Sequence, residues 1–139
     1  MAEPSYLVDT SVLARASQQL VGERLEALAL EGRLWSCRIV DLEVVYGSRS
    51  REVSEVAEER LALPEAEITP AVMNRAIQVA EMMAQAGLHR GAKPVDLVVA
   101  AAAEAARLTV LHYDKDYERI AKVTGQSMEW IAPPGTLDR

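Results

Sequence analysis

Residues 94–116, PVDLVVAAAAEAARLTVLHYDKD, decide the fold class of this chain. The proline at the start suits the first turn of a helix, and the alanine-rich run that follows favours one. The apolar segment 108–111 then predicts a short buried strand, and Asp114 and Asp116 follow its end. A helix that leads directly into a buried strand is typical of α/β proteins with a parallel sheet.

The rest of the chain alternates in the same way. Residues 6–8 are an apolar run that stops at Asp9, which predicts a second buried strand. Helices are expected over 11–20, 23–30, 39–46, 53–63, 71–86, 94–107 and 117–124, and short strands over 34–37, 67–69 and 128–131. This alternation predicts a central, mostly parallel sheet of about four or five strands with helices on both faces.

Composition limits the possible functions. The chain has 139 residues, half of them apolar and 26% charged, which indicates one globular domain over 1–139 with a sizeable core. A net charge of −6 excludes a basic protein that coats phosphates. A lone cysteine allows no internal disulfide, the first residues lack a signal-peptide pattern, and no apolar run approaches the ~20 residues that span a bilayer. We expect a cytoplasmic protein without a membrane partner.

Five acidic residues are the candidate functional groups. In parallel α/β sheets, ligands bind beyond the carboxyl ends of the strands, where Asp9, Asp114 and Asp116 are expected. Glu43 and Asp96 lie inside apolar helical runs, and a carboxylate in such surroundings needs a cation or hydrogen-bond donors. Taken singly, each acid is more readily explained as a helix cap or as a favourable charge in a first helical turn.

If these acids converge in the fold, a functional explanation becomes stronger than the structural one. Two like charges about 4 Å apart repel by about 4 kcal/mol at an effective dielectric constant of about 20. Several carboxylates together therefore require protonation or a divalent cation, and oxygen ligands select Mg²⁺ or Mn²⁺. The chain has no zinc-type spacing of histidine and cysteine and no glycine-rich nucleotide loop. This combination favours metal-assisted hydrolysis of phosphodiesters, with carboxylates as ligands and one of them as proton acceptor.

Four motifs in this chain resemble the acidic motifs of PIN-domain ribonucleases in order and spacing. They are Val8-Asp9-Thr10-Ser11, Leu42-Glu43 with Tyr46-Gly47, the run from Pro94-Val95-Asp96-Leu97 to Ala103, and His112-Tyr113-Asp114-Lys115-Asp116-Tyr117. The short length and the ending from Gly125-Gln126 to Trp130-Ile131 resemble the VapC toxins of VapBC toxin–antitoxin modules. The resemblance covers nearly the whole chain.

By position, the resemblance implies that Asp9, Glu43, Asp96 and Asp114 are the catalytic metal ligands and that Asp116 is the additional acid of the fourth motif. Ser11 matches a small polar position that hydrogen-bonds a ligand or water. The resemblance further implies a three-layer α/β/α fold and Mg²⁺-dependent endoribonuclease activity on structured RNA such as tRNA or ribosomal RNA. It also implies a homodimer and a VapB antitoxin that wraps the toxin and blocks the site.

The acidic net charge opposes binding of RNA, but local charge favours it. The stretch 82–95 contains no acid and includes Arg90 and Lys93, which we expect to hold RNA phosphates beside the metal. Arg15 and Lys115 are further candidates, and specificity would come from RNA shape. An ordinary solvated surface is the alternative for each of these residues. Apolar stripes over 25–29 and 53–61 are core by default, and an antitoxin or a dimer mate would cover any exposed part.

Other classes of protein fit this sequence less well than a PIN-like nuclease. A phosphatase of the haloacid dehalogenase type needs a second acid two residues after Asp9, where Ser11 stands. A receiver-like signalling domain needs paired acids near the first strand, and Asp9 has no acidic neighbour. The remaining alternative is a non-catalytic PIN-like module that binds RNA or protein. All the acidic motif positions are filled, which favours the enzyme.

Overall fold

The computed structural model describes residues 3–137, in which four strands and seven α-helices occur. In chain order they are β1 (Tyr6–Val8), α1 (Thr10–Leu13), α2 (Gln19–Leu30), β2 (Leu34–Trp35), α3 (Arg38–Gly47), the 3₁₀ turn η1 (Ser50–Glu52), α4 (Val53–Leu61), α5 (Pro70–Gln85), α6 (Pro94–Ala106), β3 (Thr109–His112), α7 (Asp116–Thr124) and β4 (Met128–Trp130). None of the helices described is both long and apolar enough to cross a membrane.

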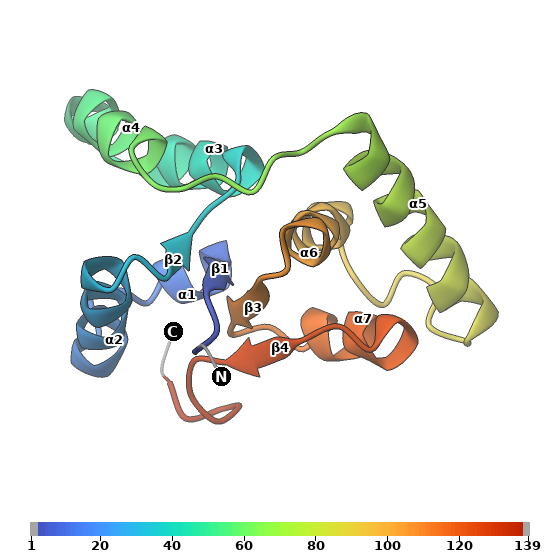
Figure 1. Ribbon diagram of the computed structural model, residues 1–139. Helices are drawn as coiled ribbons and strands as arrows, with labels where there is room; N and C mark the ends of the chain where they lie inside the picture. The colour runs from blue at the N-terminus through green and yellow to red at the C-terminus, as the bar shows by residue number, and fades with distance from the viewer. Residues whose placement is uncertain (1–2, 138–139) are drawn as a thin grey trace.

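The strands form one parallel sheet in the order β2-β1-β3-β4 (Figure 1). Tyr6 is in register with Thr109 and Val8 with Leu111, so β1 and β3 are the two central strands. The chain leaves β1 toward one edge of the sheet and later returns to its other side. The strand order therefore reverses between β1 and β3, which is where ligands bind in open α/β sheets.

Side chains that alternate along the strands divide the interior into two cores. Leu7 and Val110 belong to the core beneath α3, α5, α6 and α7. Tyr6, Val8 and Leu111 point to the opposite face and pack with residues of α1 and α2. Helices therefore cover both faces of the sheet, and the expected three-layer α/β/α fold is confirmed (Figure 1).

The expected helix over 11–20 is wrong. Helix α1 ends at Leu13, and α2 does not begin until Gln19. The Arg15 side chain donates a hydrogen bond to the Ser11 carbonyl at 2.6 Å, while the Arg15 amide bonds the carbonyl of Val12. The Ser11 carbonyl is the acceptor that a continuing α-helix would offer to that amide, so the helix tightens and stops.

The expected strand over 67–69 is also absent from the structure. Only an isolated parallel bridge forms, between Ser36 and Glu65. Thr69 instead caps α5, because its hydroxyl accepts a hydrogen bond from the Val72 amide and Pro70 occupies the first helical turn. The other expected helices and strands are present, with ends shifted by a few residues.

A buried polar network joins α4 to α3 and β2. Arg60 on α4 lies 3.0 Å from Asp41 Oδ1 and donates a hydrogen bond to Ser36 Oγ at 2.7 Å. Ser36 in turn donates to Asp41 Oδ1 at 2.8 Å. The sequence pattern places Arg60 on an apolar stripe, and the structure shows that it is buried there as an ion-pair partner. This network fixes the position of α3, the helix that carries Glu43.

Candidate metal and nuclease site

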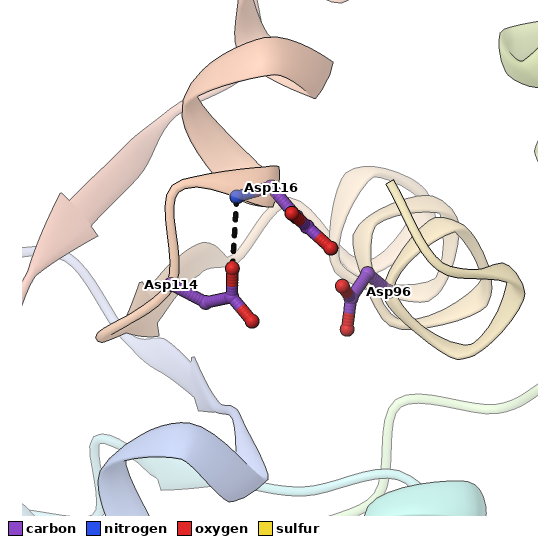
Figure 2. A group of neighbouring side chains, drawn as sticks. All are labelled: Asp96, Asp114 and Asp116. Atoms are coloured by element: carbon purple, nitrogen blue, oxygen red, sulfur yellow. Dashed lines mark hydrogen bonds between the residues drawn. The ribbon is translucent and has the colours of Figure 1, made fainter. Parts of the chain in front are cut away.

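Three carboxylates meet at the carboxyl ends of the central strands. Asp114 lies in the turn after β3, Asp116 begins α7, and Asp96 is in the first turn of α6. One oxygen atom of each lies within 4.8 Å of the others, and Figure 2 shows Asp96 facing the two acids of the turn. The Asp116 amide donates to Asp114 Oδ1 at 2.9 Å, which fixes the turn. The structure thus brings together three of the five acids predicted from the sequence.

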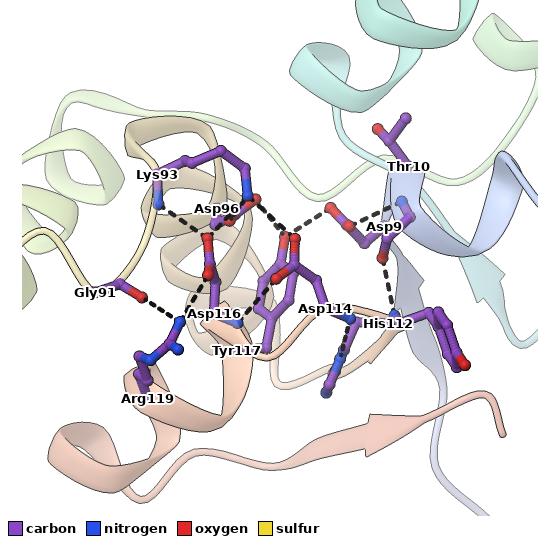
Figure 3. A network of polar contacts seen from close by, with 12 residues as sticks. Asp9, Thr10, Gly91, Lys93, Asp96, His112, Asp114, Asp116, Tyr117 and Arg119 are labelled. Atoms are coloured by element: carbon purple, nitrogen blue, oxygen red, sulfur yellow. Dashed lines mark hydrogen bonds and ion pairs between the residues drawn. The ribbon is translucent and has the colours of Figure 1, made fainter. Parts of the chain in front are cut away.

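Asp9 reaches this cluster through a tyrosine. Asp9 follows β1 and is almost fully buried, and its Oδ2 accepts a hydrogen bond from the Ser11 amide at 2.9 Å. Its Oδ1 accepts one from the Tyr117 hydroxyl at 2.6 Å. The same hydroxyl lies 3.4 Å from Asp96 Oδ1, so Tyr117 bridges the two buried acids (Figure 3).

Glu43 lies apart from the three-carboxylate cluster. Its side chain is on the exposed surface of α3, and Glu43 Oε1 accepts a hydrogen bond from the Thr10 hydroxyl at 2.6 Å. Thr10 directly follows Asp9, so Glu43 is adjacent to the site on the side of β1 and α1.

A lysine occupies the centre of the cluster. Lys93 Nζ lies 3.2 Å from Asp96 Oδ2, 3.1 Å from Asp114 Oδ2 and 2.9 Å from Asp116 Oδ2 (Figure 3). The sequence predicts that Lys93 contacts RNA phosphates, and the structure places its ammonium among the carboxylates. Arg119 contacts the outer oxygen of Asp116, Oδ1, at 3.0 Å and donates a second hydrogen bond to the Gly91 carbonyl.

Burial and neighbouring charges shift the pKa values of these acids in opposite directions. Burial raises the pKa of Asp96 to about 7, and the hydrogen bond with Asp116 and the charge of Asp9 act in the same direction. Burial also opposes ionisation of Asp116, but hydrogen bonds with Asp96 and Lys93 outweigh it and lower the pKa of Asp116. The hydrogen bond with Asp116 likewise raises the pKa of Lys93, against its partial desolvation.

Neither His112 nor Cys37 has the properties of a reactive group in this structure. Burial lowers the pKa of His112, whose Nδ1 accepts a hydrogen bond from the Asp114 amide and whose ring packs on Tyr117 and Trp130. Burial raises the pKa of the Cys37 thiol to about 11. These surroundings are those of residues that serve in packing.

The remaining predicted contact residues lie around the acids, and two of them are engaged within the protein. Besides its bond to the Ser11 carbonyl, the Arg15 guanidinium stacks 4.5 Å from the centroid of the Tyr113 ring. The Ser11 hydroxyl accepts a hydrogen bond from the Tyr113 amide. Arg90 and Lys115 are exposed, and Arg90 borders a cavity of about 640 Å³ beside Lys93.

The donor set fits a hard divalent cation. The ligand atoms are carboxylate oxygens, which Mg²⁺ and Mn²⁺ prefer. Asp96 Oδ2 is buried and makes no hydrogen bond of good geometry in the described part of the chain, where its one ionic neighbour is the Lys93 ammonium at 3.2 Å. A buried carboxylate oxygen without a hydrogen bond is costly unless a cation approaches it. The residues present therefore fit a metal ion between Asp96 and the turn after β3.

Sequence reasoning missed Tyr117 and Thr10, the hydroxyl donors to Asp9 and Glu43. Tyr117 falls on the apolar face of a short helix, where a tyrosine is read as core. Thr10 follows an acid at a strand end, and a hydroxyl there is read as a cap. The one feature of the sequence that points to Tyr117 and Thr10 is that each lies beside an acid of the motifs.

Comparison with known proteins agrees with this site. The PIN domain family model matches residues 6–123. Ribonuclease VapC21 of Mycobacterium tuberculosis is 41% identical over 133 residues, which cover 94% of this chain and 96% of that protein. Ribonuclease VapC51 of the same species is 42% identical over 134 residues, with 96% and 97% covered.

Solved structures show the same fold at low sequence identity. VapBC2 from Rickettsia felis, bound to a DNA fragment from its promoter, aligns with a TM-score of 0.70 at 18% identity and covers 90% of this chain and 97% of the solved chain. FitAB bound to an IR36 DNA fragment aligns with a TM-score of 0.71 at 17% identity, with 91% and 94% covered.

A parallel sheet with acids gathered where its strand order reverses, together with the family match, defines a PIN-domain protein. Within that family, the chain belongs to the VapC ribonucleases, to which it is similar over almost its full length.

Proposed function

We propose that this chain is the toxin of a VapBC-type pair and a metal-dependent endoribonuclease that hydrolyses phosphodiester bonds in structured RNA of the tRNA or rRNA class. The convergence of Asp96, Asp114 and Asp116, with Asp9 attached through Tyr117, carries the proposal. Relatives that are named ribonucleases support RNA as the substrate.

We assign metal binding to Asp9, Glu43, Asp96, Asp114 and Asp116, with Mg²⁺ as the natural ion and Mn²⁺ as a substitute. A divalent cation in such a site lowers the pKa of water and neutralises phosphate charge. Asp9 and Asp114 define its inner side, because backbone amides and the Tyr117 hydroxyl fix their carboxylates. Glu43 completes the set from the exposed side, where it also has room to accept a proton.

Two hollows, one lined by Lys93 and the other by Asp114 and Asp116, support a nucleic-acid substrate. The first, of about 640 Å³, lies between α5 and α6 and is lined mainly by apolar residues, with His89, Arg90 and Lys93 along it. The second, of about 510 Å³, contains Arg15, Lys115, Arg119, Tyr113 and Trp130. Cations and aromatic rings in one concave surface suit phosphates and unstacked bases. We assign Arg90, Arg15, Lys93 and Ser11 to this RNA surface, the last as a residue that orders the turn after β3.

The proposal includes a protein partner and a second copy of the chain. Solved VapBC and FitAB complexes share this fold, which supports a VapB-type antitoxin that covers the site. The exposed side chains of Leu42 on α3 and Leu61 on α4 border a groove of about 220 Å³. Together with the exposed Tyr46 of α3, they support an interface, which we assign to a homodimer. An RNA-cleaving toxin of this kind would meet its substrate in the cytoplasm.

Cleavage of total cellular RNA tests the proposal. Purified, antitoxin-free protein is incubated with RNA in Mg²⁺, in Mn²⁺ or in EDTA, and the new 5′ and 3′ ends are mapped by sequencing. We expect cleavage at one or a few sites with either metal, none in EDTA, and none by Asp9→Asn. Absence of cleavage with every metal would contradict the proposal and favour a non-catalytic binding module.

A further inference from the structure

The three carboxylates of the proposed metal site already share one cation. The Lys93 ammonium lies within 3.2 Å of an oxygen of Asp96, of Asp114 and of Asp116. These are the same three residues whose oxygens lie close enough together to hold a metal ion. Figure 3 shows the lysine side chain arching from the start of α6 over this group.

An ammonium group and a divalent cation cannot contact the same oxygens together. Both need the oxygens that face the centre of the cluster. Two cations bound to the same oxygens would lie only a few ångströms apart and would repel each other strongly. Arg119, the other cation in contact with these acids among the described residues, reaches only the outer oxygen of Asp116. The conflict with a metal ion therefore falls on Lys93.

Lys93 can leave the cluster without disturbing the fold. Its side chain is 63% exposed, whereas that of Asp96 is 6% exposed. The Lys93 amide donates a separate hydrogen bond to Asp116 Oδ2, and Pro94 holds the start of α6. Rotation of the long side chain into solvent thus frees the carboxylates and leaves the backbone in place.

We propose that Lys93 is a resident competing cation, which holds the three carboxylates together in the metal-free protein and must be displaced before a divalent ion binds. Lys93 thereby sets the metal concentration at which the site is loaded. This inference rests on the proposed function, because it concerns the same metal site.

Removal of the ammonium tests the inference. Lys93→Met keeps an unbranched side chain of nearly the same length and removes its charge. Lys122→Met is the matched control, since Lys122 is an exposed lysine on α7 away from the cluster. Mn²⁺ binding is measured by titration calorimetry and melting temperature in EDTA and in Mn²⁺. We expect Lys93→Met to bind Mn²⁺ at least about tenfold more tightly and to melt at a lower temperature in EDTA. Lys122→Met should behave as the wild type in both measurements.

Each outcome decides the inference separately from the nuclease activity. Unchanged or weaker Mn²⁺ binding by Lys93→Met would overturn it, as would absence of binding by both proteins. Binding by Lys93→Met alone would support it in its strongest form. If RNA stays intact with every metal while Lys93→Met still binds Mn²⁺ more tightly, the proposed function fails and the role of Lys93 stands.

Discussion

Within residues 3–137, the Tyr117 hydroxyl is the one neutral donor shared by two buried carboxylates of the site. It donates to Asp9 Oδ1 and lies within reach of Asp96 Oδ1, and burial raises its pKa well above the usual value. The hydroxyl therefore keeps its proton and can orient both acids toward a cation. Groups that orient metal ligands are often worth about 10- to 100-fold in metal affinity or activity.

We expect Tyr117→Phe to weaken Mn²⁺ binding and RNA cleavage by about tenfold while the protein stays folded. The phenylalanine ring keeps the packing on His112, whose centroid lies 5.0 Å away, so only the donor is lost. Titration calorimetry and cleavage at varied Mn²⁺ measure the change. Tyr6→Phe is the control, since its hydroxyl bonds Glu129 at the other end of β1, and it should alter neither value. Equal Mn²⁺ affinity for Tyr117→Phe and the wild type would remove Tyr117 from this positioning role.

The raised pKa of Asp96 predicts how the metal-free protein responds to pH. An aspartate has a pKa of about 3.9 in the unfolded chain and about 7 here, so the folded state holds its proton more tightly. The stability contribution of Asp96 must then fall as pH rises from about 4 through 7. Asp96→Asn does not titrate, so its stability relative to the wild type should rise over that window. At about 1.4 kcal/mol per pKa unit, the difference reaches at most about 4 kcal/mol.

Urea unfolding in EDTA at several pH values measures this difference. The comparison between the two proteins cancels the pH dependence of groups outside the cluster, such as Glu129, whose pKa, against its partial burial, is lowered by the hydrogen bond from Arg24. Added Mg²⁺ should restore the advantage to the wild type, because Asp96→Asn lacks a ligand. A stability difference that does not vary with pH would mean that Asp96 is ionised in the folded protein throughout.

The sequence allowed the acids to be predicted, but not their neighbours. Asp9 and Asp96 interrupt apolar runs, so their burial and their need for a partner follow from local sequence. Tyr117 and Lys93 gain their roles from contacts with residues distant in the chain. Lys93 lies 21 residues before Asp114, and only the packing of α6 against β3 brings the two together.

At the scale of the element, the packing of α4 against α3 depends on one buried ion pair between Arg60 and Asp41. The side chains of Arg60 and Asp41 are 11% and 6% exposed, and Ser36 completes their hydrogen bonding. Arg38 also contacts Asp41, at 2.8 Å, but its side chain is 39% exposed, so removal of Arg60 leaves the buried carboxylate poorly compensated. The pair therefore controls both the packing of α4 and the placement of α3, which carries Glu43.

We expect Arg60→Met to destabilise the protein by up to about 3 kcal/mol, because Asp41 loses its buried partner and keeps only the more exposed Arg38, 2.8 Å from Oδ2. Urea unfolding at neutral pH measures the loss. The control is Arg51→Met, which removes an exposed arginine from the turn before α4 and should cost less than about 0.5 kcal/mol. The double variant Arg60→Met with Asp41→Leu should recover part of the stability, because it leaves no buried charge. An effect of Arg60→Met as small as that of the control would contradict this account of the network.

The starts of helices could be predicted from the sequence where a proline occupies the first helical turn. Pro70 and Pro94 begin α5 and α6 within a residue of the expected positions. The break between α1 and α2 was not predictable, because residues 11–20 contain neither glycine nor proline and the helix ends when the Arg15 side chain takes the Ser11 carbonyl. The absent strand over 67–69 has a similar cause in the cap formed by Thr69.

At the scale of the whole molecule, strand order explains why a chain of net charge −6 can gather its acids. The alternation of strands and helices predicted the parallel sheet, and the sheet places both central strand ends on one edge. The sequence pattern could not assign the exposed apolar face of α3 and α4 to a partner, because a stripe that meets its own core and one that meets another chain have the same spacing. The net negative charge also limits the number of phosphate contacts that the molecule can make with RNA.

We expect RNA binding that depends only weakly on salt. An acidic surface repels phosphates, so few contacts contribute, and each releases about 0.7 to 0.9 counterions. Three contacts give a slope of about −2 for the logarithm of affinity against the logarithm of salt concentration. Arg90→Gln should reduce that slope by nearly one and weaken binding of all RNAs alike. Fluorescence anisotropy with tRNA at fixed Mg²⁺ and varied KCl measures this in an Asp9→Asn background, which leaves the RNA intact.

Arg107→Gln is the matched control for this prediction. Arg107 is exposed at the opposite end of α6, and its φ of 59° nearly equals the 62° of Arg90, so the two substitutions have the same charge and backbone consequences. Because Arg107 is far along the helix from the acids, its removal changes the net charge alone. Equal slopes for the two variants would show that Arg90 acts only through net charge. A steeper slope for Arg107→Gln than for Arg90→Gln would place a phosphate at Arg90, beside the cavity that Lys93 also lines.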